Sequence, residues 1–308
     1  MSHLQLIPGL PPGSLVAVIA PAGPVEPGRL PLVEPLYAAH GLRCRIYPGC
    51  AMTSGYLAGP DAQRLADLHA ALADAEVAAI HCIRGGYGAM RLLDGIDVAL
   101  VRRAQKLLVG YSDITALHAL WCLQGLPSLH APMAASDLLK AGDDPQRLAD
   151  MAALFAALAS GFAAGDILAP ARMPDHGLHV PGVAEGLLVG GNLSLVAALL
   201  GTPWAWPVAG NLLFLEDINE DAYRVDRLLT QLHLAGVFQA AAGFLLGSFT
   251  EMSAPFSELH ARLLPLGKPV LGGWPAGHGT PNRPLPLGVW ARLDSGAGTL
   301  TLRAGHPA

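Results

Sequence analysis

The chain has 308 residues, of which 52% are hydrophobic and 14% are charged, so it can bury a large core and does not have the composition of a disordered chain. Its formal net charge is −5, and its Lys and Arg residues are scattered, which argues against nucleic acid and anionic membranes as its main partners. No apolar run approaches the length of a membrane-spanning helix, and the length of the chain favours two domains.

The N-terminal stretch has no Lys or Arg before Arg29, and prolines interrupt its apolar residues. A secretory signal peptide begins with basic residues and continues into an unbroken apolar segment, so we expect a cytoplasmic protein. The four cysteines form no CxxC pair and lie in or beside apolar segments, which predicts buried free thiols in a reducing compartment. They are Cys44, Cys50, Cys82 and Cys122.

The first 130 residues alternate short apolar segments with helix-like ones. Strands are expected at residues 15–20, 42–46, 77–83, 106–110 and 127–132. Helices are expected near 28–40, over 61–74 with Asp61 as N-cap, in a short form after 88, and from 113. Short apolar strands that alternate with helices are typical of a parallel sheet covered on both faces. Residues 1–140 are therefore predicted to form a doubly wound α/β domain.

The remainder of the chain has a different character. Residues 141–168 contain an Ala-rich helical pattern, PQRLADMAALFAALASG, which we interpret as a linker between domains. Strand-like segments such as GVAEGLLVGG, NLLFLED, GFLLGS and TLTLRA then predominate. One amphipathic helix interrupts them, with Val225, Leu228, Leu229 and Leu232 on a single stripe. Residues 169–308 are predicted to form a smaller, β-rich α/β domain.

The segment KLLVGYSDITALH places Ser112 between an apolar strand and a helix. Open parallel sheets bind their ligands at the carboxyl ends of the strands, where Ser112 is expected to lie. The pattern is related to the nucleophile elbow G-x-S-x-G, although Ile114 occupies the position of the last glycine. A serine at this place is also a common helix N-cap, so both interpretations stay open on position alone.

A nucleophilic serine needs a base to take its proton and an acceptor to hold that base in one tautomer. Most of the twelve histidines lie in helix or strand patterns or near the termini, whereas His278 lies in the loop PAGHGTPNRPLPLG. Loops of this kind often carry functional residues, although a plain surface loop is the alternative. Glu216 closes the apolar run NLLFLE, where an ionised carboxylate needs a hydrogen-bonded partner. Asp217 competes for the same role, and a solvated acidic turn remains possible here.

The glycine-rich turn IRGGYG, residues 83–88, also follows a predicted strand. Consecutive glycines allow backbone N–H groups to face an anion. The chain has neither the G-x-G-x-x-G pattern nor a P-loop, so an oxyanion hole fits better than a nucleotide phosphate site. Asp113 N–H and a glycine N–H from 85–86 would supply it, unless the segment is an ordinary tight turn. Arg84 is a candidate for binding a substrate carboxylate.

Seven segments together resemble the LD-carboxypeptidases, which are serine peptidases of the muramoyltetrapeptide carboxypeptidase type. The resemblance spans nearly the whole chain, and the motifs fall in the order of that family, with a mild departure at Ser14. The segments are GSLVAVIAPAGPV, YLAGPDAQRLADL, IHCIRGGYGAMRLL, LLVGYSDITALH, GLLVGGNLSLVAALLGTP, LFLEDINEDAYRVDRLLTQLHLAG and GHGTPNRPLPLG.

The resemblance implies roles for particular residues. Ser112 would be the nucleophile, His278 the general base and Glu216 the residue that orients it. The backbone N–H groups of Gly86 and Asp113 would form the oxyanion hole. The resemblance also implies a flavodoxin-like N-terminal domain with a smaller β-rich C-terminal domain, a site between them, a homodimer, and no metal or cofactor.

The activity that the resemblance implies is release of the terminal D-alanine from murein tetrapeptides during cytoplasmic cell-wall recycling. One alternative is a related self-immunity peptidase that cleaves peptidyl-nucleotides of the microcin C type. The length of the chain and the lack of an obvious inserted loop favour the muropeptide substrate. The alternative from another class is a non-catalytic nucleotide- or ligand-binding α/β protein that uses RGGYG as its anion site.

Overall fold

A computed structural model describes residues 4–139, 144–170, 178–251 and 255–305 of the chain. Its first sheet has six strands in the order β14-β6-β5-β4-β2-β3. The strands are β2 (Leu15–Ile19), β3 (Arg43–Ile46), β4 (Val77–Cys82), β5 (Leu107–Gly110), β6 (Ser128–His130) and β14 (Leu285–Leu287). All pairings are parallel except that of β14 with β6. Strands β2 and β5 are buried along their whole length, as a sheet covered on both faces requires.

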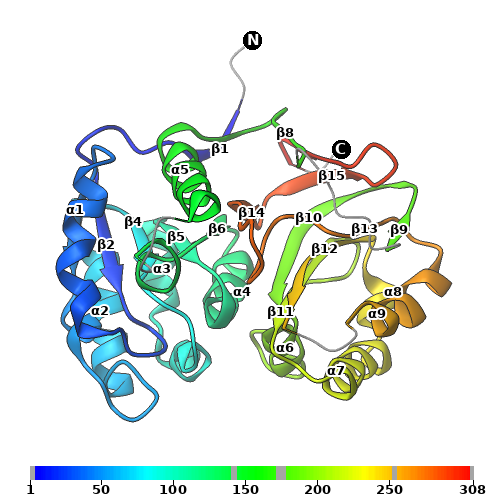
Figure 1. The fold of residues 1–308 in the computed structure, drawn as a ribbon, viewed down its shortest axis with the longest axis horizontal. Helices are drawn as coiled ribbons and strands as arrows, with labels where there is room; N and C mark the ends of the chain where they lie inside the picture. Colours follow the sequence, from blue (N-terminus) through cyan, green and yellow to red (C-terminus); the bar gives the residue numbers. More distant parts are fainter. Residues whose placement is uncertain (1–3, 140–143, 171–177, 252–254, 306–308) are drawn as a thin grey trace.

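Helical segments connect these strands and cover the sheet (Figure 1). They are η1 (Pro27–Leu32), α1 (Val33–Ala38), η2 (Pro48–Ala51), α2 (Asp61–Ala73), η3 (Ala89–Gly95), α3 (Val98–Ala104), η4 (Ser112–Ile114) and α4 (Thr115–Leu123). The prediction of Asp61 as the N-cap of its helix is wrong, because Pro60 occupies that position. Asp61 lies in the first turn instead, where its carboxylate forms ion pairs with Arg64 and Arg91.

The middle of the chain contains the expected helix. After η5 (Ala134–Leu138), α5 (Pro145–Ser160) begins with Asp144 as its N-cap, and the Asp144 carboxylate accepts a hydrogen bond from Gln146 N–H. The helix ends in β7 (Gly161–Ala163), which pairs with β1 (Gln5–Pro8) in a small antiparallel sheet. The segment that follows the helix is thereby tied back to the start of the chain.

The second sheet has eight strands in the order β8-β16-β15-β10-β11-β12-β13-β9. The strands are β8 (Ile167–Leu168), β9 (His179–Val180), β10 (Val183–Asn192), β11 (Leu212–Ile218), β12 (Gly243–Thr250), β13 (Val270–Leu271), β15 (Trp290–Asp294) and β16 (Thr299–Leu302). Strands β10 to β13 are parallel neighbours, whereas the outer strands pair antiparallel. The sheet is therefore mixed and larger in strand number than the first one.

The second sheet carries its own helices, which gather beside β11 and β12 in Figure 1. They are α6 (Leu193–Ala198), α7 (Ala222–Leu234), α8 (Val237–Ala240), α9 (Pro255–Leu263) and η6 (Leu264–Leu266). The predicted apolar stripe of α7 is confirmed, since Val225, Leu229 and Leu232 are buried and Leu228 is half-buried.

The predicted fold class is confirmed: a doubly wound parallel α/β sheet stands next to a β-rich α/β sheet (Figure 1). The division at 1–140, 141–168 and 169–308 stays a prediction, and β14 from the C-terminal part of the chain completes the first sheet. Helix α4 packs against both β10 and α6, so it lies between the two sheets. No helix among the described residues is long and apolar enough to cross a membrane.

Candidate active site

Ser112 stands at the corner between β5 and α4. Its φ is +62°, a left-handed conformation that is uncommon outside glycine and that active sites often contain. The corner is sharp because Gly110, with a φ of +156°, precedes it and the helical turn η4 begins at Ser112 itself. No side chain caps η4, and the Ser112 Oγ instead lies 3.0 Å from His278 Nε2. Of the two interpretations of this serine, the geometry matches the nucleophile.

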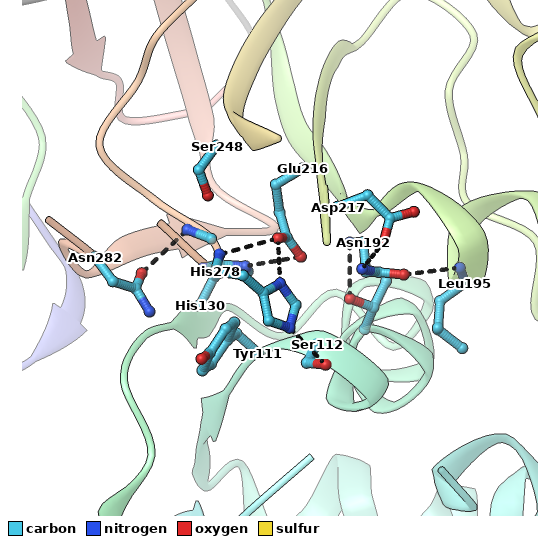
Figure 2. A network of polar contacts seen from close by, with 12 residues as sticks. Tyr111, Ser112, His130, Asn192, Leu195, Glu216, Asp217, Ser248, His278 and Asn282 are labelled. Atoms are coloured by element: carbon cyan, nitrogen blue, oxygen red, sulfur yellow. Dashed lines mark hydrogen bonds and ion pairs between the residues drawn. The ribbon is translucent and has the colours of Figure 1, made fainter. Parts of the chain in front are cut away.

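His278 lies in the loop between β13 and β14 and links Ser112 to Glu216. Its Nδ1 is 2.7 Å from Glu216 Oε2, so the three side chains form a continuous hydrogen-bonded chain (Figure 2). The loop is fixed on both sides of the histidine. Gly277 N–H donates to Asn282 Oδ1 at 3.1 Å, and Gly279 N–H donates to the hydroxyl of Ser248 at 2.7 Å.

Glu216 projects from near the end of β11, where its side chain is fully buried. The pairing of β11 with β12 is irregular between Leu215 and Asp217, and irregularities of this kind re-aim side chains next to active sites. Burial raises the pKa of Glu216, but the imidazoles of His278 and His130 lower it by more, to about 2. Glu216 is therefore an ionised acceptor at neutral pH.

The carboxylate of Glu216 also changes the pKa of His278. Burial lowers the pKa of His278, and the charge of Glu216 with its hydrogen bond outweighs that effect, so the pKa is raised above 6.5. A carboxylate that accepts from Nδ1 leaves Nε2 free to take a proton from Ser112. This is the tautomer that a general base needs.

Asp217, the rival carboxylate, faces away from His278, as neighbouring residues of a strand do. It accepts hydrogen bonds from Asn192 Nδ2 at 2.8 Å and from the backbone and hydroxyl of Ser194 at 3.0 and 2.8 Å. Burial, followed by the charge of Glu216, raises its pKa to about 6. Asp217 thus fixes the start of α6, and Glu216 is the carboxylate that contacts the histidine.

The glycine-rich loop lies directly against Ser112. A Cβ placed on Gly85 would come within 3.2 Å of Ser112 Oγ. Gly85 O accepts a hydrogen bond from Gly23 N–H at 2.9 Å, so the Gly86 N–H across the same trans peptide points away from Gly23. Asp113, which follows Ser112, is anchored because its carboxylate accepts Ala89 N–H at 2.7 Å. Both proposed oxyanion donors therefore belong to segments fixed beside the serine.

Arg84 is exposed, and its guanidinium donates to the carbonyl of Pro24. Together with Arg29 and Glu26 it lines a cavity of about 220 Å³. This cavity is separate from the one that His278 lines. The structure therefore places Arg84 beside the glycine-rich loop but not in contact with the Ser112–His278–Glu216 chain.

A cavity of about 280 Å³ opens next to His278. Tyr111 forms part of its wall, with its ring 4.8 Å from the His278 ring and its hydroxyl donating to Asp137 Oδ1 at 2.8 Å. Arg147 and Asn282 also line this cavity. The cavity carries more carboxylates than cations, and those carboxylates are Asp137, Asp144, Asp150 and Glu251.

Three residues near the site were not singled out from the sequence: Tyr111, His130 and Asn282. Tyr111 and Asn282 stand in the same segments as Ser112 and His278, and proximity in sequence was the available signal. His130 is the last residue of β6 and lies within the predicted strand 127–132, so the rule that sites lie at the carboxyl ends of parallel strands pointed to this region. Within the described residues, no group of His, Cys, Asp and Glu is arranged to hold a metal ion.

Two family models match the chain. Residues 16–131 match the LD-carboxypeptidase N-terminal domain, and residues 185–293 match the LD-carboxypeptidase C-terminal domain. The first match contains Ser112 and the glycine-rich loop, and the second contains Glu216 and His278.

Individual proteins agree with these matches. A probable murein peptide carboxypeptidase of Bacillus subtilis is 38% identical, over 95% of this chain and 92% of that protein. The crystal structure of muramoyltetrapeptide carboxypeptidase from Oxalobacter formigenes is 31% identical, with a TM-score of 0.77 over 93% of this chain and 98% of that one. The microcin C7 self-immunity protein MccF superposes with a TM-score of 0.84 over 98% and 99% of the two chains, but at 20% identity this shows a common fold alone.

Proposed function

Because the chain belongs to the LD-carboxypeptidase family, we propose that it is a serine peptidase that releases the terminal D-alanine from murein tetrapeptides. The observation that carries this proposal is the hydrogen-bonded chain from Ser112 Oγ through His278 to the buried Glu216, at 3.0 and 2.7 Å. A serine hydroxyl becomes a strong nucleophile when such a base is adjacent and oriented.

The first half of the reaction forms an acyl-enzyme. His278 Nε2 takes the Ser112 proton as Oγ attacks the carbonyl carbon that joins the L-configured centre to D-alanine. The carbonyl oxygen becomes an oxyanion, which the N–H groups of Gly86 and Asp113 stabilise. The His278 imidazolium then gives its proton to the leaving D-alanine nitrogen, and the C–N bond breaks.

The second half regenerates the serine. Water enters in place of D-alanine, and His278 takes one of its protons as the oxygen attacks the acyl carbon. The ester bond to Ser112 breaks, and Oγ recovers the proton from His278. Glu216 keeps its charge throughout and stabilises each transient imidazolium through Oε2.

The sequence comparisons favour a muropeptide over a peptidyl-nucleotide. The relatives and structures named for murein peptides are 38% and 31% identical to this chain, whereas MccF is 20% identical. We infer that the protein acts in the cytoplasm on peptides released by cell-wall turnover. We also expect a homodimer, which light scattering would detect as twice the chain mass of 31.9 kDa.

The decisive assay measures D-alanine release from purified murein tetrapeptide, with a peptidyl-adenylate as the competing substrate. We expect release from the tetrapeptide by the wild-type protein and none by Ser112→Ala, whose cooperative unfolding should stay intact. Faster cleavage of the peptidyl-adenylate would favour the self-immunity type of peptidase. Near-wild-type release by Ser112→Ala would exclude Ser112 as the nucleophile.

A separate experiment addresses the non-catalytic alternative. A serine-directed phosphonate followed by peptide mass spectrometry should place one adduct on Ser112, because only an activated serine reacts at useful rates. A folded sample that forms no adduct at Ser112 would favour a ligand-binding protein over a peptidase.

We also propose which side chain binds the terminal carboxylate of the substrate. We place it with Arg84, which precedes Gly85 in the chain and lines a cavity together with Arg29 and Glu26. Arg84→Gln should then raise KM for the tetrapeptide more than it lowers kcat. The matched change Arg43→Gln, at a strand on the far edge of the first sheet, should leave both constants unchanged.

A further inference from the structure

His130 is the last residue of β6, and its side chain is fully buried. Its backbone lies between β5 and β14, opposite Gly110 on one side and Leu285 on the other. One of these strands leads to Ser112, and the other follows the His278 loop. The imidazole is thus close to the candidate active site and shielded from solvent.

Neither ring nitrogen of His130 has a hydrogen-bond partner among the described residues. A neutral imidazole carries one donor and one acceptor, and an unpaired polar group in the interior costs about 1–3 kcal/mol. His118, whose ring is 6.5 Å away, shows the usual arrangement. Its nitrogens contact Ser128 Oγ at 2.8 Å and Gly110 O at 2.9 Å. The unpaired imidazole of His130 therefore calls for an explanation other than packing.

The polar atom that faces His130 is Glu216 Oε1. The distance from His130 Nε2 to this oxygen is 4.0 Å, and Oε1 also has no hydrogen-bond partner in the described structure. The second oxygen, Oε2, is the one that contacts His278. Figure 2 shows both imidazoles next to the carboxylate. Aromatic rings surround the rest of His130, with Tyr111 at 5.5 Å and Phe214 at 5.1 Å between ring centroids.

We propose that His130 is a positioning residue that donates its Nε2–H to Glu216 Oε1 once substrate is bound, an assignment that rests on the proposed peptidase function. A hydrogen bond between nitrogen and oxygen spans about 2.7–3.2 Å, so a movement of about 1 Å closes it. Hydrogen bonds in active sites are often long without substrate and tighten in its complex. Because His130 belongs to the first sheet and Glu216 to the second, this bond would align the two sheets beside Ser112.

The role of His130 is to hold the carboxylate, and it exchanges no proton. With donors on both oxygens, Glu216 keeps its orientation while His278 cycles between imidazole and imidazolium. Burial of the pair makes each of these hydrogen bonds stronger than the same bond in water. Other titratable groups interact through their charge with this pair or with His278 beside it, and they are Tyr111, His118, Asp137 and Asp217.

The test compares two variants of the full-length protein. His130→Phe keeps the planar shape and removes the donor, whereas His130→Gln keeps an N–H near the position of Nε2. We expect His130→Phe to lower kcat by about 10- to 100-fold with little change in KM, by analogy with residues that hold metal ligands in orientation. His130→Gln should restore kcat to within about threefold of wild type. Equal losses in the two variants, or none in either, would overturn the proposal.

The pH profile separates positioning from packing. Loss of the second donor leaves more negative charge facing His278 in the substrate complex, so His130→Phe should move the acid limb of kcat to higher pH by about half a unit. A purely structural defect would lower the melting temperature and leave the limb in place. An unmoved limb in a folded His130→Phe sample would therefore contradict the assignment.

Two further readouts do not depend on D-alanine release. The rate of phosphonylation of Ser112 should follow the same order, with wild type and His130→Gln above His130→Phe. This measurement uses no peptide, so it still tests the role of His130 if the natural substrate is not a murein tetrapeptide. If the wild-type protein neither reacts with phosphonate nor cleaves peptide, both proposals fail together. In ¹⁵N-histidine-labelled protein, phosphonylation should move the imidazole N–H resonance of His130 downfield. That resonance is identified by its absence from the spectrum of His130→Gln. Without that shift, the hydrogen bond to Glu216 does not form.

Discussion

At the scale of single residues, the surroundings of a side chain decide its pKa, even where the sequence shows two residues of the same chemical type. Glu216 and Asp217 are adjacent carboxylates at the end of one strand, yet the pKa of the first is lowered to about 2 and that of the second is raised to about 6. The difference arises because Glu216 faces two imidazoles, whereas Asp217 faces amide and hydroxyl donors next to the charge of Glu216. The difference agrees with the proposed role of Glu216, which is to orient His278, and with the position of Asp217 at the start of α6.

Exchange of each carboxylate for its amide tests this division. Glu216→Gln should lower kcat by about four orders of magnitude, the loss known when the acid of a Ser-His-Asp triad is replaced, because His278 then adopts the wrong tautomer. Asp217→Asn should retain most of the activity and unfold more easily by about 1–3 kcal/mol, because acceptors of buried donors are lost. Steady-state kinetics and chemical denaturation measure both. The reverse pattern would assign the orienting role to Asp217.

The activity of the protein should depend on pH through His278. The base must be neutral to accept a proton, and its pKa is raised above 6.5 because Glu216 outweighs the effect of burial. Activity should therefore fall as the pH drops through a midpoint above 6.5, by about tenfold per unit below it. A kcat/KM profile between pH 5 and 9 measures the midpoint. In Glu216→Gln the midpoint of the residual activity should move to lower pH, and no movement would contradict this cause.

At the scale of elements, the candidate catalytic residues lie at or near the carboxyl ends of strands. Ser112 follows β5, the glycine-rich loop follows β4, and Glu216 lies near the end of β11. The sequence predicts these placements because each apolar run stops where the functional residue begins. It could not show that β14 returns to the first sheet and carries the His278 loop with it, since pairing between distant strands leaves no local pattern.

The glycine-rich loop packs closely against Ser112, the proposed nucleophile, and this contact can be tested. The backbone of Gly85 accepts a side chain, but its Cβ would lie 3.0 Å from Ser112 Cβ and would push the serine out of line. Gly85→Ala should lower kcat/KM by about 100-fold, since displacement of a reacting atom by about 1 Å has effects of this size. Gly28→Ala is the matched control, because nothing lies within 4 Å of a Cβ there. Equal activity of both variants would mean that the loop shifts to accommodate the methyl group without displacing Ser112, which would contradict the prediction.

At the scale of the whole molecule, the candidate active site lies where two sheets meet. Asn192 N–H of β10 donates to Thr115 Oγ1 of α4 at 3.0 Å, one turn after Ser112. Gly191 allows this approach, since a Cβ at that position would lie 2.6 Å from the same hydroxyl. The sequence identified three of the residues that meet here, but the depth of burial and the distances depend on how the sheets pack. That information is not local to any motif.

This contact between the sheets can be tested with an isosteric change. Thr115→Val removes the acceptor and leaves the buried Asn192 N–H unpaired, which should lower the free energy of unfolding by about 1–3 kcal/mol. Because Ser112 and Glu216 belong to different sheets, kcat should fall as well. Thr299→Val on β16, two strands outside β10, is the control for stability and activity. A stable Thr115→Val variant with full activity would show that other contacts set the alignment.

The return of the chain through β14 has a mechanical consequence. The chain passes from one sheet to the other three times, once through α5 and twice around β14. Two sheets joined by a single linker could separate without breaking any strand pairing, whereas here separation must also pull β14 away from β6. The His278 loop runs into β14, so the segment that carries the base is tied to the sheet that carries Ser112. Loss of the β14–β6 pairing should therefore disrupt the contact between serine and histidine as well as the first sheet.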